Sequence, residues 1–385
     1  MFNVGEEIKL EISGLSSNGS GVGRVNGFVV FVENALTGET VKARITKICR
    51  NHAEATTQEI ISESPHRIKR SCKAQNCGGC VLMCLKYEKQ LEHKLCVVND
   101  ALKRIGSLET QAEEIIGMEV PFRYRNKARF HANDGKIGFF AHNSHEVTDI
   151  SDCIITHEMN KTVIKEAKKI ENLPQEILFR VGFNTGEILT NPQILGKTDF
   201  IYEKLSDVNF RVSADSFFQV NTVQAEQLYK TALEFAAPDN ETVVDAYCGT
   251  GSIGLYFSKK ASPKKIIGIE INEKAVRDAK INAALNQVQN ASFINGYSEN
   301  IFKEIAKEAS VVVVDPPRSG CGKKLLKSLI DNKKNVRRLV YVSCDPATFA
   351  RDAKILSEGG FYLQRIKAFD MFPQTAEVET AAIFI

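Results

Sequence analysis

The chain has 385 residues, of which 43% are hydrophobic and 25% are charged, and its formal net charge is +3. This length allows two or three domains with a substantial buried core. The N-terminus has no apolar signal region, and no run approaches the roughly 18 apolar residues of a membrane span, so we expect a cytoplasmic protein that crosses no membrane. With so small a net charge, affinity for a nucleic acid has to come from local basic patches.

Residues 1–62 read as short strands separated by glycine-rich turns. The stretch 19–24 is glycine-rich, 28–32 is a β-branched and aromatic run, and apolar and basic residues alternate over 41–45. Short strands without a helical period favour a small β-barrel. Such a barrel either binds RNA or has a purely structural role.

Groups of basic residues in the N-terminal third favour an RNA partner, although each group taken alone could be a solvated face. The groups are Lys42, Arg44, Lys47 and Arg50; His66, Arg67, Lys69, Arg70 and Lys73; and Arg123, Arg125, Lys127 and Arg129.

Ten cysteines in a chain expected in the cytoplasm favour metal binding or catalysis over disulfides. Cys72, Cys77 and Cys80 follow a C-x4-C-x2-C spacing, which is too open for a zinc knuckle made of two C-x-x-C pairs. Close thiolates with one distant partner suit a cubane iron–sulfur cluster. Zinc is the main alternative metal. Cys84 is the nearest candidate for a fourth ligand, but its position fits a helix start better.

Residues 63–205 are predicted to form a central α+β domain. Apolar residues at helical spacing predict a helix over 84–105 that ends at Gly106 and packs on the C-terminal domain. Between 107 and 205 the pattern mixes strands and helices without a clear repeat.

From residue 206 to 385 strands and helices alternate regularly. Buried parallel strands are predicted over 242–247, 265–271, 311–314 and 339–343, followed by a terminal pair at 361–369 and 378–385. Asn272 can cap the helix that follows the second strand. The pattern indicates a Rossmann-like, doubly wound α/β domain.

A glycine-rich turn follows the first of these strands. Gly249, Gly251 and Gly254 spell G-x-G-x-x-G at a helix start, where the backbone can approach a ligand and unpaired N–H groups are available. Glu270, at the end of the next strand, can hold a ribose. This turn alone fits a nicotinamide dinucleotide and S-adenosylmethionine equally well.

Two further motifs favour S-adenosylmethionine. Asp245-x-x-Cys-Gly-Thr-Gly resembles motif I of class I methyltransferases, and Asp315-Pro-Pro-Arg follows the fourth strand. The two prolines fix the backbone just past the strand end, which aims Asp315 into the crevice where doubly wound sheets bind ligands.

Cys344 and Glu379 are the candidate catalytic residues. Cys344 follows the fifth parallel strand at its ligand-facing edge, although a lone cysteine is more often a buried structural thiol. Glu379 lies in a predicted strand beside apolar neighbours and is a candidate general base with a raised pKa; Glu377 is the alternative. A thiolate that adds to carbon 6 of uracil makes carbon 5 nucleophilic, and a base must remove the proton left on carbon 5 after methylation.

The motifs S-C-D-P-A-T-F-A-R-D, D-P-P-R, M-F-P-Q-T-x-x-V-E and F-F-Q-V-N resemble those of the RNA 5-methyluridine methyltransferase family. The resemblance implies methyl transfer from S-adenosylmethionine to carbon 5 of a uridine, with Cys344 as nucleophile and Glu379 as base. It also implies a donor pocket that includes Gln219, Tyr247, Ser252, Glu270 and Asp315. Near the adenine the family usually has Asp or Asn, whereas this chain has Tyr297, so Ser298 or Glu299 could substitute.

The N-terminal part carries a second resemblance. G-x-G-V-G-R followed by G-F-V-V-F-V resembles a TRAM domain, an OB-like RNA-binding barrel, and the cysteines resemble those of family members that carry a [4Fe-4S] cluster. The resemblance implies Cys72, Cys77, Cys80 and Cys153 as ligands. Within the family, this combination implies 23S ribosomal RNA as the substrate, with transfer RNA as the alternative. No obligatory protein partner is evident.

The target uridine has to leave its stack to lie between Cys344 and the methyl donor. Phe217, Phe218 and Phe372 are candidates to stack on it, and each could equally be a core residue. Other functions fit the motifs less well. A cytosine-5 enzyme would usually carry a cysteine after the fourth strand, an amino-group methyltransferase needs no nucleophilic cysteine, and an RNA-binding protein without activity needs no catalytic set.

Overall fold

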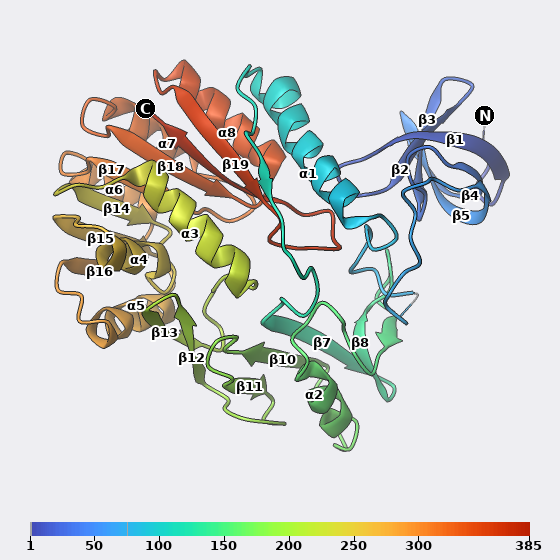
Figure 1. Ribbon diagram of the computed structural model, residues 1–385, viewed down its shortest axis with the longest axis horizontal. Coiled ribbons are helices and arrows are strands. Elements are labelled where there is room, and N and C mark those ends of the chain that lie inside the picture. Colours follow the sequence, from blue (N-terminus) through green and yellow to red (C-terminus); the bar gives the residue numbers. More distant parts are fainter. Residues whose placement is uncertain (1, 75) are drawn as a thin grey trace.

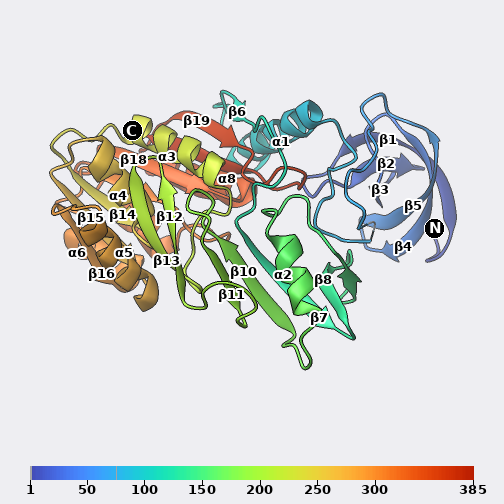
Figure 2. The ribbon, with the colours of Figure 1, turned by 60° about the horizontal axis from the view of Figure 1, so that its bottom comes forward.

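The computed structural model describes residues 2–74 and 76–385. Figure 1 shows an N-terminal barrel on one side, a large sheet covered by helices on the other, and a smaller central sheet between and below them. Helix α1 runs between the barrel and the large sheet, and Figure 2 shows the same order of parts from another side. The barrel, α1 and the large sheet together surround the cleft described below.

The N-terminal part is a closed barrel of five strands in the order β1-β2-β3-β5-β4. The strands are β1 (Glu7–Leu15), β2 (Gly21–Val25), β3 (Phe28–Glu33), β4 (Thr40–Ile48) and β5 (His52–Ser62). Alternate residues of β1 and β4 point inward and are buried, as the alternating sequence pattern predicts. β3 pairs in parallel with β5, and β4 pairs with β1 to close the barrel.

A buried ion pair holds the barrel to the chain that leaves it. The Glu39 carboxylate is 1% exposed and accepts hydrogen bonds from Leu36 N at 2.8 Å and Ser64 N at 3.3 Å. It also accepts from Arg67 Nε at 2.5 Å and Arg67 Nη2 at 2.9 Å. Arg67, one of the cations of the second basic group, is therefore paired with a buried carboxylate within the protein.

Helix α1 (Tyr87–Ala101) continues into a short π-helical segment, η1 (Leu102–Gly106). It begins three residues after the predicted start at 84, and it ends with Gly106 as predicted. Val98 and Leu102 are buried in one core with residues of the C-terminal sheet, and α1 packs against α8 (Pro346–Glu358). The helix thus belongs structurally to the C-terminal part.

The central part is a five-stranded sheet of order β11-β10-β7-β8-β9, covered by α2 (Asn160–Ala167). Its strands are β7 (Lys127–Asn133), β8 (Lys136–Phe140), β9 (Val147–Asp149), β10 (Glu176–Val181) and β11 (Ile188–Asn191). A separate hairpin, β12 (Phe200–Leu205) and β13 (Val208–Ser213), leads into the C-terminal part and packs on its helix α5 (Glu273–Leu285).

The C-terminal part is an eight-stranded sheet of order β16-β15-β14-β17-β18-β20-β19-β6. β16, β15, β14, β17 and β18 are parallel, whereas β20 is antiparallel to β18 and β19. The strands are β6 (Ile115–Ile116), β14 (Thr242–Ala246), β15 (Lys265–Glu270), β16 (Ala291–Asn295), β17 (Val311–Val314), β18 (Arg338–Ser343), β19 (Leu363–Phe369) and β20 (Glu379–Phe384).

Helices cover both faces of this sheet, so its central strands are buried on both sides. The helices are α3 (Thr222–Ala236), α4 (Ser252–Lys260), α5 (Glu273–Leu285), α6 (Ser298–Ile305), α7 (Lys323–Asp331) and α8. All four residues of β17 are fully buried, as the continuous apolar run predicts. Asn272 caps α5 by accepting hydrogen bonds from Lys274 N and Ala275 N, as predicted. Across the described ranges, no helix is both long and apolar enough to span a bilayer.

The Arg67–Glu39 pair makes the stability of the barrel dependent on pH. Burial acts to raise the pKa of Glu39, but the hydrogen bonds and charge of Arg67 outweigh it, so this pKa lies below its usual value. We expect Arg67→Met to destabilise the barrel by about 3 kcal/mol at pH 7, because it leaves a buried carboxylate unpaired. A carboxylate whose pKa is lowered in the folded state stabilises the fold above about pH 4.5, and this stabilisation is lost at lower pH. The difference in free energy of unfolding between native protein and Arg67→Met should therefore shrink as the solution is acidified.

Hydrogen exchange of the β1 and β4 amides measures this effect locally. Arg44→Met is the matched control, because Arg44 pairs with the exposed Glu7 on the outside of the barrel. If Arg67→Met destabilises the barrel by no more than Arg44→Met does, the prediction is wrong.

Candidate active site

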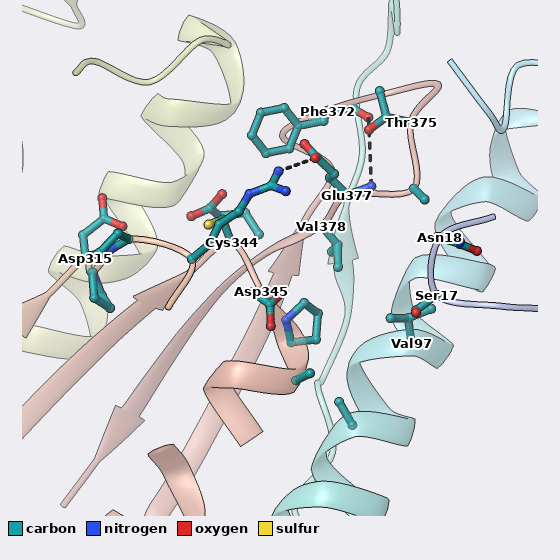
Figure 3. A pocket seen from close by; sticks show the side chains of 18 of the residues that line it. Ser17, Asn18, Val97, Asp315, Cys344, Asp345, Phe372, Thr375, Glu377 and Val378 are labelled. Atoms are coloured by element: carbon teal, nitrogen blue, oxygen red, sulfur yellow. Dashed lines mark hydrogen bonds and ion pairs between the residues drawn. The ribbon is translucent and has the colours of Figure 1, made fainter. Parts of the chain in front are cut away.

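A deep cleft runs along the carboxyl ends of the parallel strands. Tyr247, Asp315 and Cys344, which follow β14, β17 and β18, lie on one wall. Residues 13–18 of the barrel and one side of α1 form the opposite wall. In Figure 3, Ser17 and Val97 lie across the cleft from Asp315 and Cys344. The site is therefore assembled from parts that are far apart in the sequence.

The glycine turn after β14 has the backbone that its residues allow. Gly249 and Gly251 have φ angles of +53° and +77°, which favour glycine. A Cβ on Gly249 would meet open space, whereas one on Gly251 would lie 2.8 Å from the ring of Phe293. Gly249 lines the cleft, so it leaves the backbone open to a ligand. Gly251 instead allows close packing between the turn and β16.

Buried carboxyl groups line the floor of the cleft beside this turn. Asp245 is 1% exposed; its Oδ2 accepts from Gly254 N at 3.0 Å, and its Oδ1 has no partner among the described residues. Burial, with the nearby charges of Asp315 and Glu270, raises the pKa of Asp245 to about 7. Burial also raises the pKa values of Asp315 and Glu379, and the two carboxylates repel each other.

This concentration of negative charge distinguishes between the two ligands that the glycine turn allows. A cation bound beside Asp245 and Asp315 would relieve their mutual repulsion, as the sulfonium of S-adenosylmethionine would. The two phosphates of a nicotinamide dinucleotide would increase it. The donor set therefore fits S-adenosylmethionine.

The remaining candidate donor-binding residues also line the cleft. Glu270 Oε2 accepts from Gly249 N at 3.0 Å, which ties the end of β15 to the glycine turn. Gln219 Nε2 lies 3.5 Å from Asp315 Oδ2, and the Ser252 hydroxyl lies 2.8 Å from that of Tyr229. Seven of the eight predicted donor residues line the cleft: Gln219, Tyr247, Gly249, Ser252, Glu270, Tyr297 and Asp315. The eighth, Gly251, is not part of the lining.

At the end of the cleft near β16, Tyr297 is 61% exposed and directly precedes α6. Ser298 and Glu299 line the same end. The hydroxyl of Tyr247 donates to Glu299 Oε1 at 3.5 Å, and Tyr247 has a positive φ of 70°. The structure thus brings Tyr297 and both of its proposed substitutes together.

The strand register places Cys344 next to Glu379. In the ladder between β18 and β20, Ser343 pairs with Thr380, so Cys344 and Glu379 occupy the next position outward. Such opposed residues have Cβ atoms roughly 5 Å apart. Burial and the charges of Glu379 and Asp315 raise the pKa of the Cys344 thiol to about 12, and Arg318 opposes this shift.

Glu379 and Glu377 differ sharply in environment. Glu379 is 2% exposed and begins β20, and burial together with the charges of Asp315 and Glu377 raises its pKa. Glu377 lies in the preceding loop rather than on a strand, its side chain is 40% exposed, and it forms an ion pair with Arg318. Figure 3 shows Glu377 above Cys344. Glu379 is therefore a buried carboxyl group with a raised pKa, whereas Glu377 is a partly exposed carboxylate paired with a cation.

The three phenylalanines proposed to stack on a base have different positions. Phe217 is 61% exposed in the cleft, and Phe372 is partly buried in the cleft wall. Phe218 is 5% exposed and packs on Phe210 in the core, so it is not available for stacking. Neighbouring residues in an extended segment point to opposite sides, which explains why only one of the pair faces the cleft.

The four predicted cluster ligands converge below the barrel. Cys72, Cys80 and Cys153 pack in one apolar group with Met83, Tyr124 and Ile155. Burial, and then the charges of Cys153, Cys77 and Cys72, raise the pKa of Cys80 to about 12. Among the described residues, no three of these four sulfur atoms lie within 4.8 Å of one another. Cys84 lies instead near the guanidinium of Arg67.

Another group of possible metal ligands lies on the barrel. Ligand atoms of Cys49, His52 and Glu54 lie within 4.8 Å of one another. However, Lys47 Nζ already lies 3.2 Å from Glu54 Oε1, and the His52 ring packs edge-on against Phe31. A cation there would have to displace the lysine.

Many cations of the three basic groups are paired within the protein. Lys42 and Arg44 both contact Glu7, and Arg129 contacts Glu176. Arg123 forms a two-pronged pair with Asp152, beside Cys153. Arg125, in contrast, lines the cleft. The groups are therefore weaker RNA surfaces than the sequence suggests, because strand pairing puts a carboxylate opposite many of the cations.

Comparison with known proteins identifies the family. Residues 146–385, more than half of the chain, match the tRNA (Uracil-5-)-methyltransferase family, and residues 2–57 match the TRAM domain. The chain belongs to the tRNA (uracil-5-)-methyltransferase family. It is an S-adenosylmethionine-dependent RNA (uracil-5-)-methyltransferase whose N-terminal barrel is a TRAM domain.

Relatives resemble this methyltransferase along nearly its whole length. A Bacillus cereus protein described as an RNA methyltransferase is 36% identical, with 98% of this chain and 96% of that protein covered. A Clostridium tetani protein with the same description is 37% identical, with 96% and 94% covered. The Pyrococcus abyssi tRNA (uracil-54, C5)-methyltransferase, solved in complex with S-adenosyl-L-homocysteine, is 26% identical with a TM-score of 0.81, and the match covers 98% of this chain and 100% of that one.

Sequence reasoning about this methyltransferase missed two features of the site. Arg318, the last residue of D-P-P-R, lies near Cys344, and its positive charge partly offsets the rise in the pKa of that thiol. Its place directly after Asp315-Pro-Pro could have indicated this. Lys94 of α1 and Asp370, which directly follows β19, form a fully buried ion pair. The helical periodicity of α1 gave no signal for this, because the partner lies at the other end of the chain.

The raised pKa of Cys344 predicts how the free protein reacts with alkylating agents. Only the thiolate reacts, so a thiol with pKa about 12 should be alkylated slowly at pH 7.5. We expect the iodoacetamide labelling rate of Cys344, followed by peptide mass spectrometry, to keep rising through pH 9.5. Glutathione in the same tube, as a free thiol, should level off above its own pKa of about 8.5.

Arg318→Met should slow the labelling of Cys344 further at every pH below 10, because it removes the nearby positive charge. A rate for the native protein that levels off near pH 8.5, like that of glutathione, would show that burial does not control this thiol.

Proposed function

We propose that this methyltransferase acts on carbon 5 of a specific uridine in 23S ribosomal RNA through a covalent adduct with Cys344. The observation that carries this proposal is the register of β18 and β20, which sets Cys344 opposite Glu379 at the edge of the donor cleft. A nucleophile and a base on the same side of one pocket are what a uracil C5 reaction requires.

The donor residues proposed for this chain are those that line the cleft beside the acidic floor. Gly249 leaves the glycine turn open, Glu270 lies at the end of β15 for a ribose, and Asp315 and Gln219 lie where the methionine part would extend. Bound there, S-adenosylmethionine supplies the methyl group. The Pyrococcus abyssi enzyme was solved with S-adenosyl-L-homocysteine, the product left when that donor loses its methyl group, which supports the same donor here.

In the proposed reaction Cys344, as thiolate, forms a bond from Sγ to carbon 6 of the uracil. Carbon 5 then takes the methyl group and still carries its proton. Glu379 removes that proton, the double bond between carbons 5 and 6 re-forms, and the bond to Cys344 breaks. The raised pKa of Glu379 makes it a stronger base than an ordinary carboxylate. Arg318 would help to stabilise the thiolate of Cys344.

The choice of ribosomal RNA rests on the TRAM barrel together with the cysteine set. The second candidate substrate is transfer RNA, because the solved relative that matches over 98% of this chain is a tRNA (uracil-54, C5)-methyltransferase. Either RNA would enter the cleft between the barrel and the C-terminal part, with Phe217 and Phe372 available to stack on unpaired bases.

We also propose that Cys72, Cys77, Cys80 and Cys153 hold a [4Fe-4S] cluster. A zinc ion with four thiolates at about 2.3 Å would bring the sulfur atoms within about 3.8 Å of one another. Among the described residues no three of these sulfurs lie within 4.8 Å of one another, which suits the larger cubane better than a single zinc ion. The apolar surroundings of Cys72, Cys80 and Cys153 also suit thiolates that bound iron neutralises. By position, the cluster would brace the segment between the barrel and α1.

The mechanism predicts a covalent complex with 5-fluorouracil RNA. Fluorine at carbon 5 cannot be removed as a proton, so the adduct with Cys344 should persist on a denaturing gel when S-adenosylmethionine is present. We expect this complex with 23S ribosomal RNA and not with transfer RNA transcripts, and we expect none with Cys344→Ala.

Cys49→Ala is the matched control, because Cys49 follows β4 of the barrel and does not line the cleft. If the adduct forms with transfer RNA instead, transfer RNA is the substrate. Methyl transfer to ordinary RNA by Cys344→Ala at the native rate would overturn the covalent mechanism.

The cluster proposal predicts about four irons per chain and a broad absorbance near ~400 nm in anaerobically purified protein. Cys80→Ser should lose most of both signals, because Cys80 packs in one apolar group with Cys72 and Cys153. Cys84→Ser should keep them, because its thiol lies near Arg67. Protein that contains stoichiometric zinc and no iron would contradict the proposal.

A further inference from the structure

The loop between β19 and β20 carries side chains that face the reacting atoms. It spans 370–378, and the pairing of Phe369 with Glu379 closes it. Phe372 and Glu377 point from it toward the cleft, as Figure 3 shows, and Glu379 follows directly. Gln374, in its middle, has a φ of +74°, a conformation that a residue with a side chain keeps only when its surroundings impose it. The contacts that hold this loop therefore decide where Glu379 lies.

Lys94 of α1 makes the central contact. Its side chain is 0% exposed, and its Nζ lies 2.5 Å from Asp370 Oδ1 and 3.0 Å from the carbonyl oxygen of Phe372. Asp370 is also 0% exposed, and its Oδ2 accepts from the hydroxyl of Tyr87 at 2.8 Å. One lysine thus holds both the first residue of the loop and the backbone of Phe372.

Gln90, one turn before Lys94, holds the middle of the loop. Its Nε2 donates to Gln374 Oε1 at 3.1 Å, and its Oε1 accepts from Gln374 N at 3.1 Å. Tyr87, Gln90 and Lys94 are spaced by three and four residues, so they form one polar stripe on the helix face that meets the loop. The carbonyl of Gln374 accepts from Leu82 N at 3.0 Å, which joins the loop to the cysteine segment.

Burying a charged lysine in this space costs desolvation free energy. Burial lowers the pKa of Lys94 although Asp370 opposes the shift, and apolar residues of similar size often stabilise a fold better than a buried ion pair does. Apolar residues, however, could not fix the backbone of Phe372 by a hydrogen bond. The pair is suited to setting one geometry of the loop.

We propose that Lys94 is a positioning residue for Glu379: through Asp370 and the Phe372 carbonyl, it fixes the loop so that the carboxylate of Glu379 faces the uracil ring held by Cys344. This inference rests on the proposed function. Lys94 touches neither Cys344 nor the donor-binding residues, so its effect falls on the step that needs the base.

That step is removal of the carbon 5 proton. When Glu379 is displaced, Cys344 can still bond to carbon 6 and carbon 5 can still take the methyl group. The proton then stays on carbon 5, the double bond does not re-form, and the bond between Sγ and carbon 6 persists. Loss of Lys94 should therefore trap a methylated, covalent complex with ordinary uridine RNA, which the native enzyme resolves.

The test uses the full-length protein, labelled S-adenosylmethionine and unmodified RNA that the native enzyme methylates. For Lys94→Met we expect a first-turnover burst of methyl transfer close to that of native protein, kcat reduced about 10²-fold with little change in KM, and a gel-stable adduct. Lys94→Arg, which keeps a cation, should partly restore turnover and reduce the adduct. Lys89→Met is the matched control, because Lys89 lies on the same helix but pairs with Glu92.

If Lys94→Met loses both the first-turnover burst of methyl transfer and steady-state turnover, and forms no adduct, Lys94 only supports the fold. That result would overturn the inference. If Lys94→Met does not fold, as judged by circular dichroism, Gln90→Met replaces it, because this variant keeps the ion pair and removes the bonds to Gln374. Glu379→Gln provides the reference. If Glu379→Gln forms no adduct, the proposed mechanism fails; if Glu379→Gln forms one and the folded Lys94 or Gln90 variant does not, only the positioning inference fails.

Discussion

In the ladder between β18 and β20, Ser343 lies opposite Thr380, and this register sets the rest of the site. Because the side-chain period of a strand is two, a slip of one residue would turn every side chain of β20 to the other face of the sheet. The register is fixed from both sides by burial, since β20 is buried along its whole length. The position of Glu379 relative to Cys344 is thus a consequence of core packing.

The cleft combines a negative floor with walls from distant segments. Asp245, Asp315 and Glu379 come from three strands whose ends meet at one edge of the sheet. Their burial stores electrostatic repulsion that a cationic ligand relieves, so donor binding and the charge of the catalytic groups are linked. The barrel and α1 form the other wall, which leaves room for a large, folded substrate between them.

The sequence predicted the parts of this structure that depend on local pattern. The strand at 311–314 is continuously apolar because helices cover both faces, and Asn272 caps a helix because its side chain can reach two free N–H groups. Features that depend on long-range pairing were not accessible. The carboxylate partners of Lys42 and Arg44, the burial of Phe218 and the separation of Glu377 from β20 all depend on neighbours that only the folded chain brings together.

The distance along the chain between Lys94 and Asp370 has a consequence during biosynthesis. The two residues are 276 positions apart, and a ribosome adds about 5 to 20 residues each second, so Lys94 is made about 14 to 55 seconds before its carboxylate. During that interval the charge of Lys94 lacks the carboxylate that it pairs with in the folded protein. The contact between Lys94 and Asp370 can therefore form only after β19 has been made, so the loop that carries Phe372 and Glu377 is fixed late in folding.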